Sequence, residues 1–187
     1  MARVLLLYGS TEGQTAIVSE RIADVLSEAG HEPTLIHAKH LPDDLTVSDY
    51  EAVVVGASIH MGKHQRYITR FVREHADELN RLPSAFFSVS LSAAQETEEG
   101  WETARELLEE FLDDTGWNPD STAVVPGALR YSQYGRIKRF IMKRIASRQG
   151  DDTDTSRDYE YTDWDEVEGF ATDFESLFSE PKQESQS

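Results

Sequence analysis

The amino-acid sequence predicts an α/β fold in which five parallel strands form a doubly wound sheet, in the order 2-1-3-4-5, with helices on both faces. Short apolar runs alternate with segments of helical periodicity along the first half of the chain, as in repeated strand–helix units. The apolar runs are continuous, which is typical of strands buried on both faces. In such a sheet, ligands bind at the carboxyl ends of the strands, near the point where the strand order reverses.

The individual elements follow from these two patterns and from the residues between them. Apolar runs predict strands over residues 4–8, 33–37, 51–57, 84–91 and 122–129. Amphipathic periodicity predicts helices over residues 14–29, 64–79, 101–111, 134–148 and 163–178. Gly30 is expected to end the first helix, and Thr162 or Asp163 to cap the last. We expect one domain over residues 1–179 and a polar, disordered tail over residues 180–187.

The composition excludes several classes of site. The chain has 187 residues and no cysteine, which excludes a disulfide framework, a thiolate metal site and a cysteine nucleophile. Redox chemistry would therefore need a bound cofactor, and we expect no metal. The apolar runs are too short for a transmembrane helix, and the first residues lack the features of a secretory signal. We expect a cytoplasmic protein.

The charge is strongly negative. Thirty-five acidic residues and eighteen basic ones give a formal net charge of −17, and this field repels nucleic acid, so we expect no nucleic-acid partner. Carboxylates on most of the predicted helix surfaces are typical of a halophilic protein; an ordinary acidic protein is the alternative. We expect the structure to be lost at low salt, where self-repulsion is unscreened. Thermal unfolding in about 0.1 M and in molar-range KCl tests this, and an equal Tm in both would contradict it.

The loop after the first expected strand carries hydroxyl groups to a helix N-terminus. Backbone N–H groups and hydroxyls at such a position bind phosphate, and the helix dipole favours the negative charge. A triphosphate site would need a lysine where Gln14 stands, and the G-x-G-x-x-G pattern of a dinucleotide site is absent. The neutral donors suit a monophosphate; a simple capping turn is the alternative.

This loop, Ser10-Thr11-Glu12-Gly13-Gln14-Thr15, resembles the S/T-x-x-G-x-T loop of the flavodoxin superfamily. The resemblance implies a flavodoxin-like fold and FMN as the cofactor, with its phosphate held by Ser10, Thr11, Glu12, Gly13, Gln14 and Thr15. A response-regulator receiver domain shares the fold, but it needs acidic residues after the first strand and an aspartate after the third. This chain has Tyr8-Gly9-Ser10 and Gly56-Ala57-Ser58 at those places.

Two further loops follow the third and fourth expected strands. Glycines on both sides of the first of them let the backbone come close to a planar ligand. Because these loops border the flavin in flavodoxin-like proteins, the resemblance implies flavin contacts from Ser58, Ile59, His60, Met61, Gly62, Ser90, Leu91, Ser92 and Ala93. An exposed surface position is the alternative for His60. His64 is expected to be exposed at the start of a helix.

A basic segment stands out from the acidic chain. Residues 130–148 contain no acid and seven basic residues: Arg130, Arg136, Lys138, Arg139, Lys143, Arg144 and Arg148. Over residues 134–145 the apolar side chains form one helical stripe, so we expect a basic amphipathic helix over residues 134–148. Such a helix could dock an anionic substrate, an anionic membrane surface or a partner. A helix packed on the core, with its basic face balancing nearby carboxylates, is the alternative.

A resemblance to a known family rests on the three loops, on this basic segment, and on the stretches Gly127-Ala128-Leu129-Arg130-Tyr131 and Tyr161-Thr162-Asp163-Trp164. The chain resembles the flavodoxin-type, menaquinone-dependent protoporphyrinogen oxidase family nearly end to end. The resemblance implies FMN-dependent oxidation of protoporphyrinogen IX to protoporphyrin IX, with electrons passed to menaquinone in the membrane. It places the substrate propionates beside Arg130, Arg136 and Arg139. The acidic loop at residues 92–100 departs from the family, where this region is basic and rich in proline.

Two other functions are compatible with the sequence. One is an FMN electron carrier that docks a protein redox partner through its acidic surface. The other is an NADPH-dependent quinone reductase, although no second nucleotide site is visible. No side chain is identified as a catalytic acid or base, so the chemistry is expected to belong mostly to the flavin.

Overall fold

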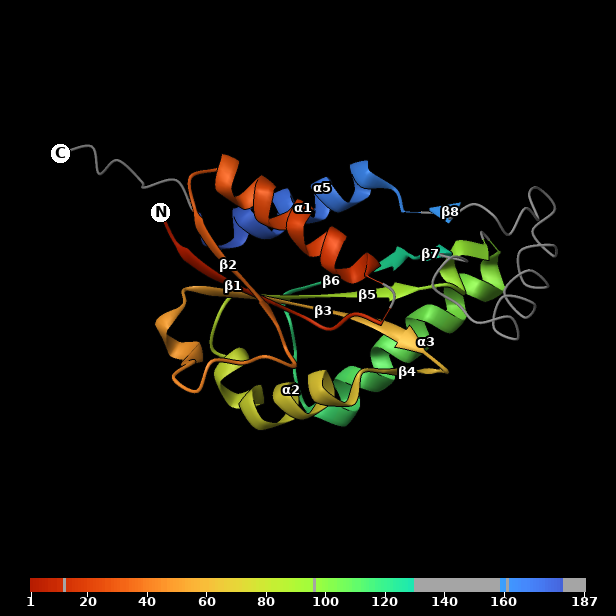
Figure 1. Cartoon of the computed structure of the whole chain (residues 1–187), viewed down its shortest axis with the longest axis horizontal. Coiled ribbons are helices and arrows are strands. Elements are labelled where there is room, and N and C mark those ends of the chain that lie inside the picture. Colours follow the sequence, from red (N-terminus) through yellow and green to blue (C-terminus); the bar gives the residue numbers. More distant parts are fainter. Residues whose placement is uncertain (12, 96, 130–158, 161, 180–187) are drawn as a thin grey trace.

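Five parallel strands form the centre of the fold, in the order β2-β1-β3-β5-β6 (Figure 1). The computed structural model describes residues 1–11, 13–95, 97–129, 159–160 and 162–179. The five strands are β1 (Arg3–Tyr8), β2 (Glu32–His37), β3 (Ala52–His60), β5 (Ser84–Ser90) and β6 (Ser121–Pro126). All four pairings between them are parallel. The predicted order 2-1-3-4-5 is therefore confirmed; the labels differ because the short strand β4 lies between the third and fourth of these strands.

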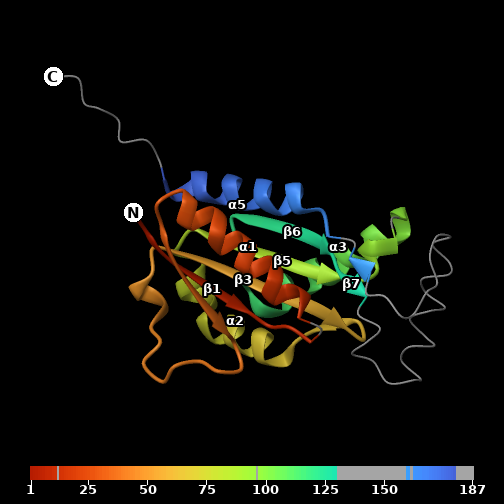
Figure 2. The same cartoon turned by 45° about the horizontal axis from the view of Figure 1, so that its top comes forward.

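Helices cover both faces of the sheet (Figures 1 and 2). The upper layer in Figure 1 holds α1 (Gln14–Glu28) and α5 (Trp164–Phe178), and the lower layer holds α2 (Arg66–Leu79) and α3 (Glu98–Thr115). Two short 3-10 helices, η1 (Val47–Asp49) and η2 (Ala93–Gln95), complete the helical elements of the described residues. Each layer has its own apolar core, because the continuous apolar strands present side chains to both faces.

The β1 strand shows how the sequence builds this double core. Leu5 and Leu7 pack into the cluster with α2 and α3, whereas Val4 and Leu6 pack into the cluster with α1 and α5. All four side chains are at most 1% exposed. Successive side chains of a strand point to opposite faces, so one apolar run supplies both layers.

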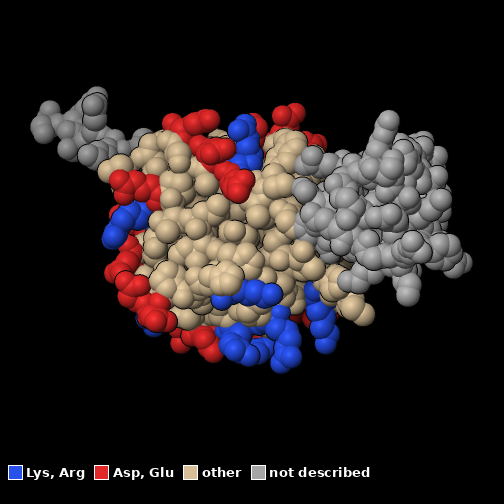
Figure 3. All heavy atoms as spheres, viewed as in Figure 1, with Lys and Arg blue, Asp and Glu red and all other residues tan. Residues whose placement is uncertain are grey.

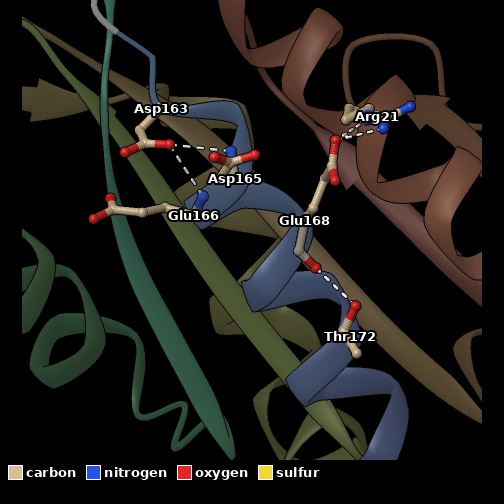
Figure 4. A network of polar contacts seen from close by, with 6 residues as sticks. All are labelled: Arg21, Asp163, Asp165, Glu166, Glu168 and Thr172. Atoms are coloured by element: carbon tan, nitrogen blue, oxygen red, sulfur yellow. Dashed lines mark hydrogen bonds and ion pairs between the residues drawn. The ribbon is translucent and has the colours of Figure 1, made fainter.

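The start of α5 confirms the expected cap (Figure 4). A carboxylate oxygen of Asp163 accepts hydrogen bonds from the backbone N–H groups of Asp165 and Glu166, at 3.0 and 3.3 Å. This contact satisfies two of the N–H groups that lack partners inside a helix. One turn further, Glu168 pairs with Arg21 of α1, which links the two helices of this layer.

The third strand is longer than predicted and turns back on itself. It continues beyond residue 57 to His60 and pairs with β4 (Lys63–His64), an antiparallel strand of two residues that the sequence analysis did not predict. Met61 and Gly62 form the connection, with φ values of +51° and +76°. Two successive positive φ values are typical of the two-residue hairpin turn. Because this hairpin uses residues 63 and 64, α2 begins at Arg66 instead of residue 64.

Two other boundaries differ from the prediction. The third helix is longer than residues 101–111, because the Thr97 hydroxyl caps it by accepting a hydrogen bond from the Gly100 N–H at 3.0 Å. The fifth parallel strand ends at Pro126 instead of residue 129, since proline ends the pairing. After it, β7 (Ala128–Leu129) pairs with β8 (Tyr159–Glu160) in a separate antiparallel sheet. The expected basic helix at 134–148 and the tail at 180–187 lie outside the described residues.

Candidate cofactor site

The loop between β1 and α1 is held tightly at both ends. The Gly9 N–H donates to the Gly56 carbonyl of β3 at 2.9 Å, which keeps the loop beside the neighbouring strand. Inside the loop, the Gly13 N–H donates to the Ser10 hydroxyl oxygen at 2.8 Å. No described side chain caps α1, so N–H groups of its first turn face the loop without an intrahelical partner. This arrangement offers donors to an anion at the positive end of the helix dipole.

Thr15, in the first turn of α1, has an unsatisfied hydroxyl. The residue is 0% exposed, and its hydroxyl oxygen is buried without a hydrogen-bond partner among the described residues. A buried hydroxyl without a partner costs roughly 1–3 kcal/mol, so such groups call for a specific explanation. A ligand oxygen bound in the loop would supply the missing partner. The residues present therefore fit a bound phosphate group.

The Gln14 side chain makes a hydrogen bond within the protein. Its amide nitrogen donates to the Thr162 hydroxyl at 2.8 Å, and that hydroxyl donates to the Pro126 carbonyl at 2.8 Å. This chain of bonds joins the start of α1 to the end of β6 and to the residues before α5.

The second loop is the β3–β4 hairpin with its turn. Ile59 and His60 pair with His64 and Lys63, which makes the hairpin a defined projection beyond the sheet. Met61, at the apex, is 90% exposed. The turn needs a left-handed conformation at Gly62, and glycine adopts it without steric cost. The hairpin therefore presents an apolar side chain and an accessible backbone at the carboxyl end of β3.

His64 is buried, so the expectation of an exposed position was wrong. Its Nε2 lies 2.8 Å from the Ser88 hydroxyl of β5, and its ring contacts those of Phe86 and Phe111. Pairing of β4 with β3 turns this side chain toward α3, which helix periodicity could not indicate. Burial favours the neutral form and lowers the pKa of His64 to about 4. This histidine is therefore a neutral, buried side chain that supports the hairpin by packing against β5 and α3.

The third loop follows β5 and is fixed by α3. The Ser90 and Ser92 hydroxyls lie 2.7 Å apart, and the Gly127 N–H donates to the Ser90 carbonyl at 3.0 Å. A Cβ added at Gly100 would lie 2.2 Å from the Ser92 carbonyl oxygen, so only glycine permits this approach of helix and loop. Close packing against α3 thus sets the path of the loop backbone.

The topology brings the three loops to one edge of the sheet. They leave the carboxyl ends of β1, β3 and β5, which are neighbours, and Ser58 pairs directly with Val89. The described residues of the loops at 10–15, 58–62 and 90–93 thus lie at the same edge of the sheet, and Glu12 is outside the described residues. Arg130, Arg136 and Arg139 are also outside them. No group of three metal-ligating side chains occurs in the described part of the chain.

One residue of this site was missed by the sequence analysis. The side-chain amide of Gln65 lies between the first two loops and bonds both Thr11 and Ser58. Gln65 is 54 positions from Thr11 in the sequence, and no local sequence pattern indicates such a contact. Only the strand order, which places β1 beside β3, brings these residues together.

Basic side chains gather on one side of the acidic surface. Figure 3 shows Lys and Arg side chains along the lower side of the molecule, where α2 and the hairpin lie in Figure 1. We call Lys63, Arg66, Arg70 and Arg73 the α2 basic strip; they line a groove shared with α3. The strip belongs to a stretch, residues 52–73, that contains no acid. Of its members, Arg73 pairs with Asp114 across the groove.

In the described part of the chain, no helix has both the length and the apolar character needed to cross a membrane. An apolar stretch of about 20 residues would be required for this.

Comparisons with known proteins agree with this architecture. Residues 5–156 match a family model described as a flavodoxin domain. The chain is 35% identical over 179 residues to protoporphyrinogen IX dehydrogenase [quinone] of Escherichia coli (strain K12), which covers 96% of this chain and 98% of that protein. A protein of the same name from Leishmania major is 33% identical over 175 residues, covering 94% of this chain and 75% of that one.

A solved structure supports the fold independently. A mutant of flavodoxin from Pseudomonas aeruginosa, in which one cysteine is replaced by serine, superposes with a TM-score of 0.50 at 20% identity, covering 79% of this chain and 96% of that one. At this level of identity the likeness concerns the fold alone.

Proposed function

The chain belongs to the flavodoxin domain family, and from this premise we propose that it is an FMN-dependent dehydrogenase that oxidises protoporphyrinogen IX to protoporphyrin IX and reduces a quinone. The observation that carries the proposal is the 35% identity to the Escherichia coli dehydrogenase, which extends over nearly the full length of both chains. Relatives from a bacterium and from Leishmania major carry the same name. The three loops that meet at the carboxyl edge of the sheet support the same assignment.

FMN is the cofactor that these loops suit. The neutral donors of the β1–α1 loop and the unpartnered Thr15 hydroxyl would hold its phosphate. The hairpin at residues 58–62 and the loop at residues 90–93 would border its ring. When bound, FMN supplies acceptance of a hydride equivalent from the substrate and its transfer to the quinone. The protein supplies binding, orientation and exclusion of water from the ring.

The substrate combines a large apolar macrocycle with two carboxylates. Arg130, Arg136 and Arg139 follow β7 in the sequence, and we assign them to the carboxylates, because a guanidinium forms paired hydrogen bonds with such groups. Formation of protoporphyrin IX removes six electrons and six protons, so three two-electron steps reduce three quinones to quinols. No described side chain is assigned as an acid or base.

We further assign menaquinone as the quinone and the inner face of the cytoplasmic membrane as its location. The acid-free segment at residues 134–148 would contact anionic lipids, which attract basic surfaces by about 1 kcal/mol per Lys or Arg. The α2 basic strip supports the same orientation, because it lies next to the hairpin that borders the site.

Replacement of Arg130 tests the substrate assignment. We expect Arg130→Ala to reduce kcat/KM for protoporphyrinogen IX about 10- to 100-fold, because a charge-assisted hydrogen bond contributes about 1.5–3 kcal/mol. FMN affinity should be unchanged, as measured by the quenching of flavin fluorescence. A parallel loss of FMN binding would instead indicate a folding defect. Turnover at the wild-type rate would show that Arg130 does not bind the substrate.

The whole reaction is tested anaerobically in two steps. The FMN-loaded protein in high-salt buffer is mixed with protoporphyrinogen IX, and the flavin absorbance is followed before and after addition of a menaquinone analogue. Bleaching by the porphyrinogen and recovery with the quinone are the expected results. Bound FMN that stays oxidised would contradict the dehydrogenase function.

That negative result would favour the second candidate, an FMN electron carrier. The acidic surface favours it, because thirty-five carboxylates could dock a basic redox partner. Against it stands the concentration of seven basic residues within residues 130–148, which such docking does not use.

A further inference from the structure

The side chain of Gln65 connects two loops of the cofactor site. Its Oε1 accepts a hydrogen bond from the Ser58 N–H at 3.0 Å. Its Nε2 donates to the Thr11 hydroxyl oxygen at 3.2 Å and also to the Ser58 hydroxyl oxygen. One amide thus contacts the phosphate loop and the end of β3 at the same time. The contacts use both Nε2 protons and one lone pair of Oε1.

The position of Gln65 in the fold makes this arrangement costly for the helix. Gln65 is the N-cap residue of α2, yet its side chain makes no capping hydrogen bond to the helix. Ser, Thr, Asp and Asn are the residues that stabilise a helix at this position, and glutamine is not among them. The Gln65 side chain therefore stabilises the phosphate loop through its bond to Thr11 and does not stabilise the start of α2.

The direction of these bonds determines what the two hydroxyls offer to a ligand. The Ser58 N–H can only donate, so it fixes Oε1 as the acceptor and Nε2 as the donor. The Thr11 and Ser58 oxygens therefore both accept from Gln65. Each hydroxyl proton is then left to point elsewhere, and both lie at the edge where the phosphate and the flavin would bind.

We propose that Gln65 is a positioning residue that orients the Thr11 and Ser58 hydroxyls as donors toward the phosphate and ring acceptors of the cofactor. It also holds the phosphate loop at a fixed distance from the hairpin, which reduces the ordering cost of binding. This inference rests on FMN binding, which is one part of the proposed function, and is independent of the substrate that is oxidised.

The test compares FMN with riboflavin, which lacks the phosphate. In Gln65→Glu, a carboxylate accepts from both hydroxyls, turns their protons away from the ligand and adds negative charge near the phosphate. We expect FMN affinity to fall about 100-fold and riboflavin affinity about tenfold or less, measured by flavin fluorescence at constant high salt. In the control Asn118→Asp, the same amide-to-carboxylate change occurs at an exposed residue before β6, and both affinities should stay at wild-type values.

A double-mutant cycle gives a second readout. Thr11→Ala should weaken FMN binding severalfold in the wild-type background, and by clearly less in a Gln65→Met background, where the Thr11 hydroxyl is no longer oriented. This cycle also decides the question if Gln65→Glu does not fold. Equal effects of Thr11→Ala in both backgrounds would overturn the proposal, as would equal losses of FMN and riboflavin affinity in Gln65→Glu.

Different results would refute the proposed function and the role of Gln65. A wild-type protein that binds neither flavin refutes the proposed function and this inference together. A wild-type protein that binds FMN, with variants that retain normal discrimination against riboflavin, refutes only the role of Gln65.

Discussion

Acidification from about pH 7 to about pH 4 is expected to lower the free energy of unfolding by about 3 kcal/mol through a single buried side chain, His64. Its pKa in the folded protein is about 4, against 6.5 for the ordinary group. Above pH 6.5 the imidazole is neutral in both states and the stabilisation is complete. Between pH 6.5 and 4 the unfolded chain binds a proton that the folded protein does not, so stability falls as the pH falls.

Urea unfolding at constant high KCl, followed from about pH 7 to about pH 4, measures this effect. In His64→Gln, which keeps a polar partner for Ser88 but does not titrate, the loss of stability over this range should be smaller by about 3 kcal/mol. Identical slopes for wild type and His64→Gln would show that His64 takes up its proton in the folded state as readily as in the unfolded state.

Replacement of Thr15 by valine is expected to change stability and cofactor affinity in opposite directions. The Thr15 hydroxyl is buried without a partner among the described residues, so its removal should raise the stability of the cofactor-free protein by about 1 kcal/mol. A hydroxyl that donates to a phosphate contributes about 1.5–3 kcal/mol to binding, so FMN affinity should fall about 10- to 100-fold.

Thermal unfolding without FMN and titration with FMN measure the two effects of Thr15→Val. Thr34→Val is the matched control, because it makes the same chemical change at an exposed residue of β2 and should leave FMN affinity unchanged. A Thr15→Val protein that is less stable and binds FMN normally would mean that the hydroxyl has a partner within the protein.

The sheet order and the site loops were predictable because both depend on patterns that are local. Continuous apolar runs mark doubly buried strands, and hydroxyl- and glycine-rich segments directly after them mark loops at the carboxyl edge. The burial of His64 was not predictable in this way, because a strand of two residues leaves no periodicity. The bridge from Gln65 to Thr11 was not predictable either, since the strand order places the two loops side by side but does not indicate which side chains bond across them.

The end of the fifth parallel strand is a third feature that the sequence did not predict. The apolar run at residues 122–129 reads as one strand, but Pro126 divides it into a parallel strand and a short antiparallel one. The partner of that second piece, β8, lies far along the chain at residues 159–160, so pairing and not local preference sets the boundary.

The β7–β8 pair has a consequence for how this protein could diversify. Leu129 and Tyr159 are paired directly, so the chain leaves the cofactor domain and returns to it at neighbouring points. The Gln14–Thr162–Pro126 bonds secure the same junction from the side of α1 and β6. The length and composition of residues 130–158 can therefore change without altering any strand pairing of the central sheet.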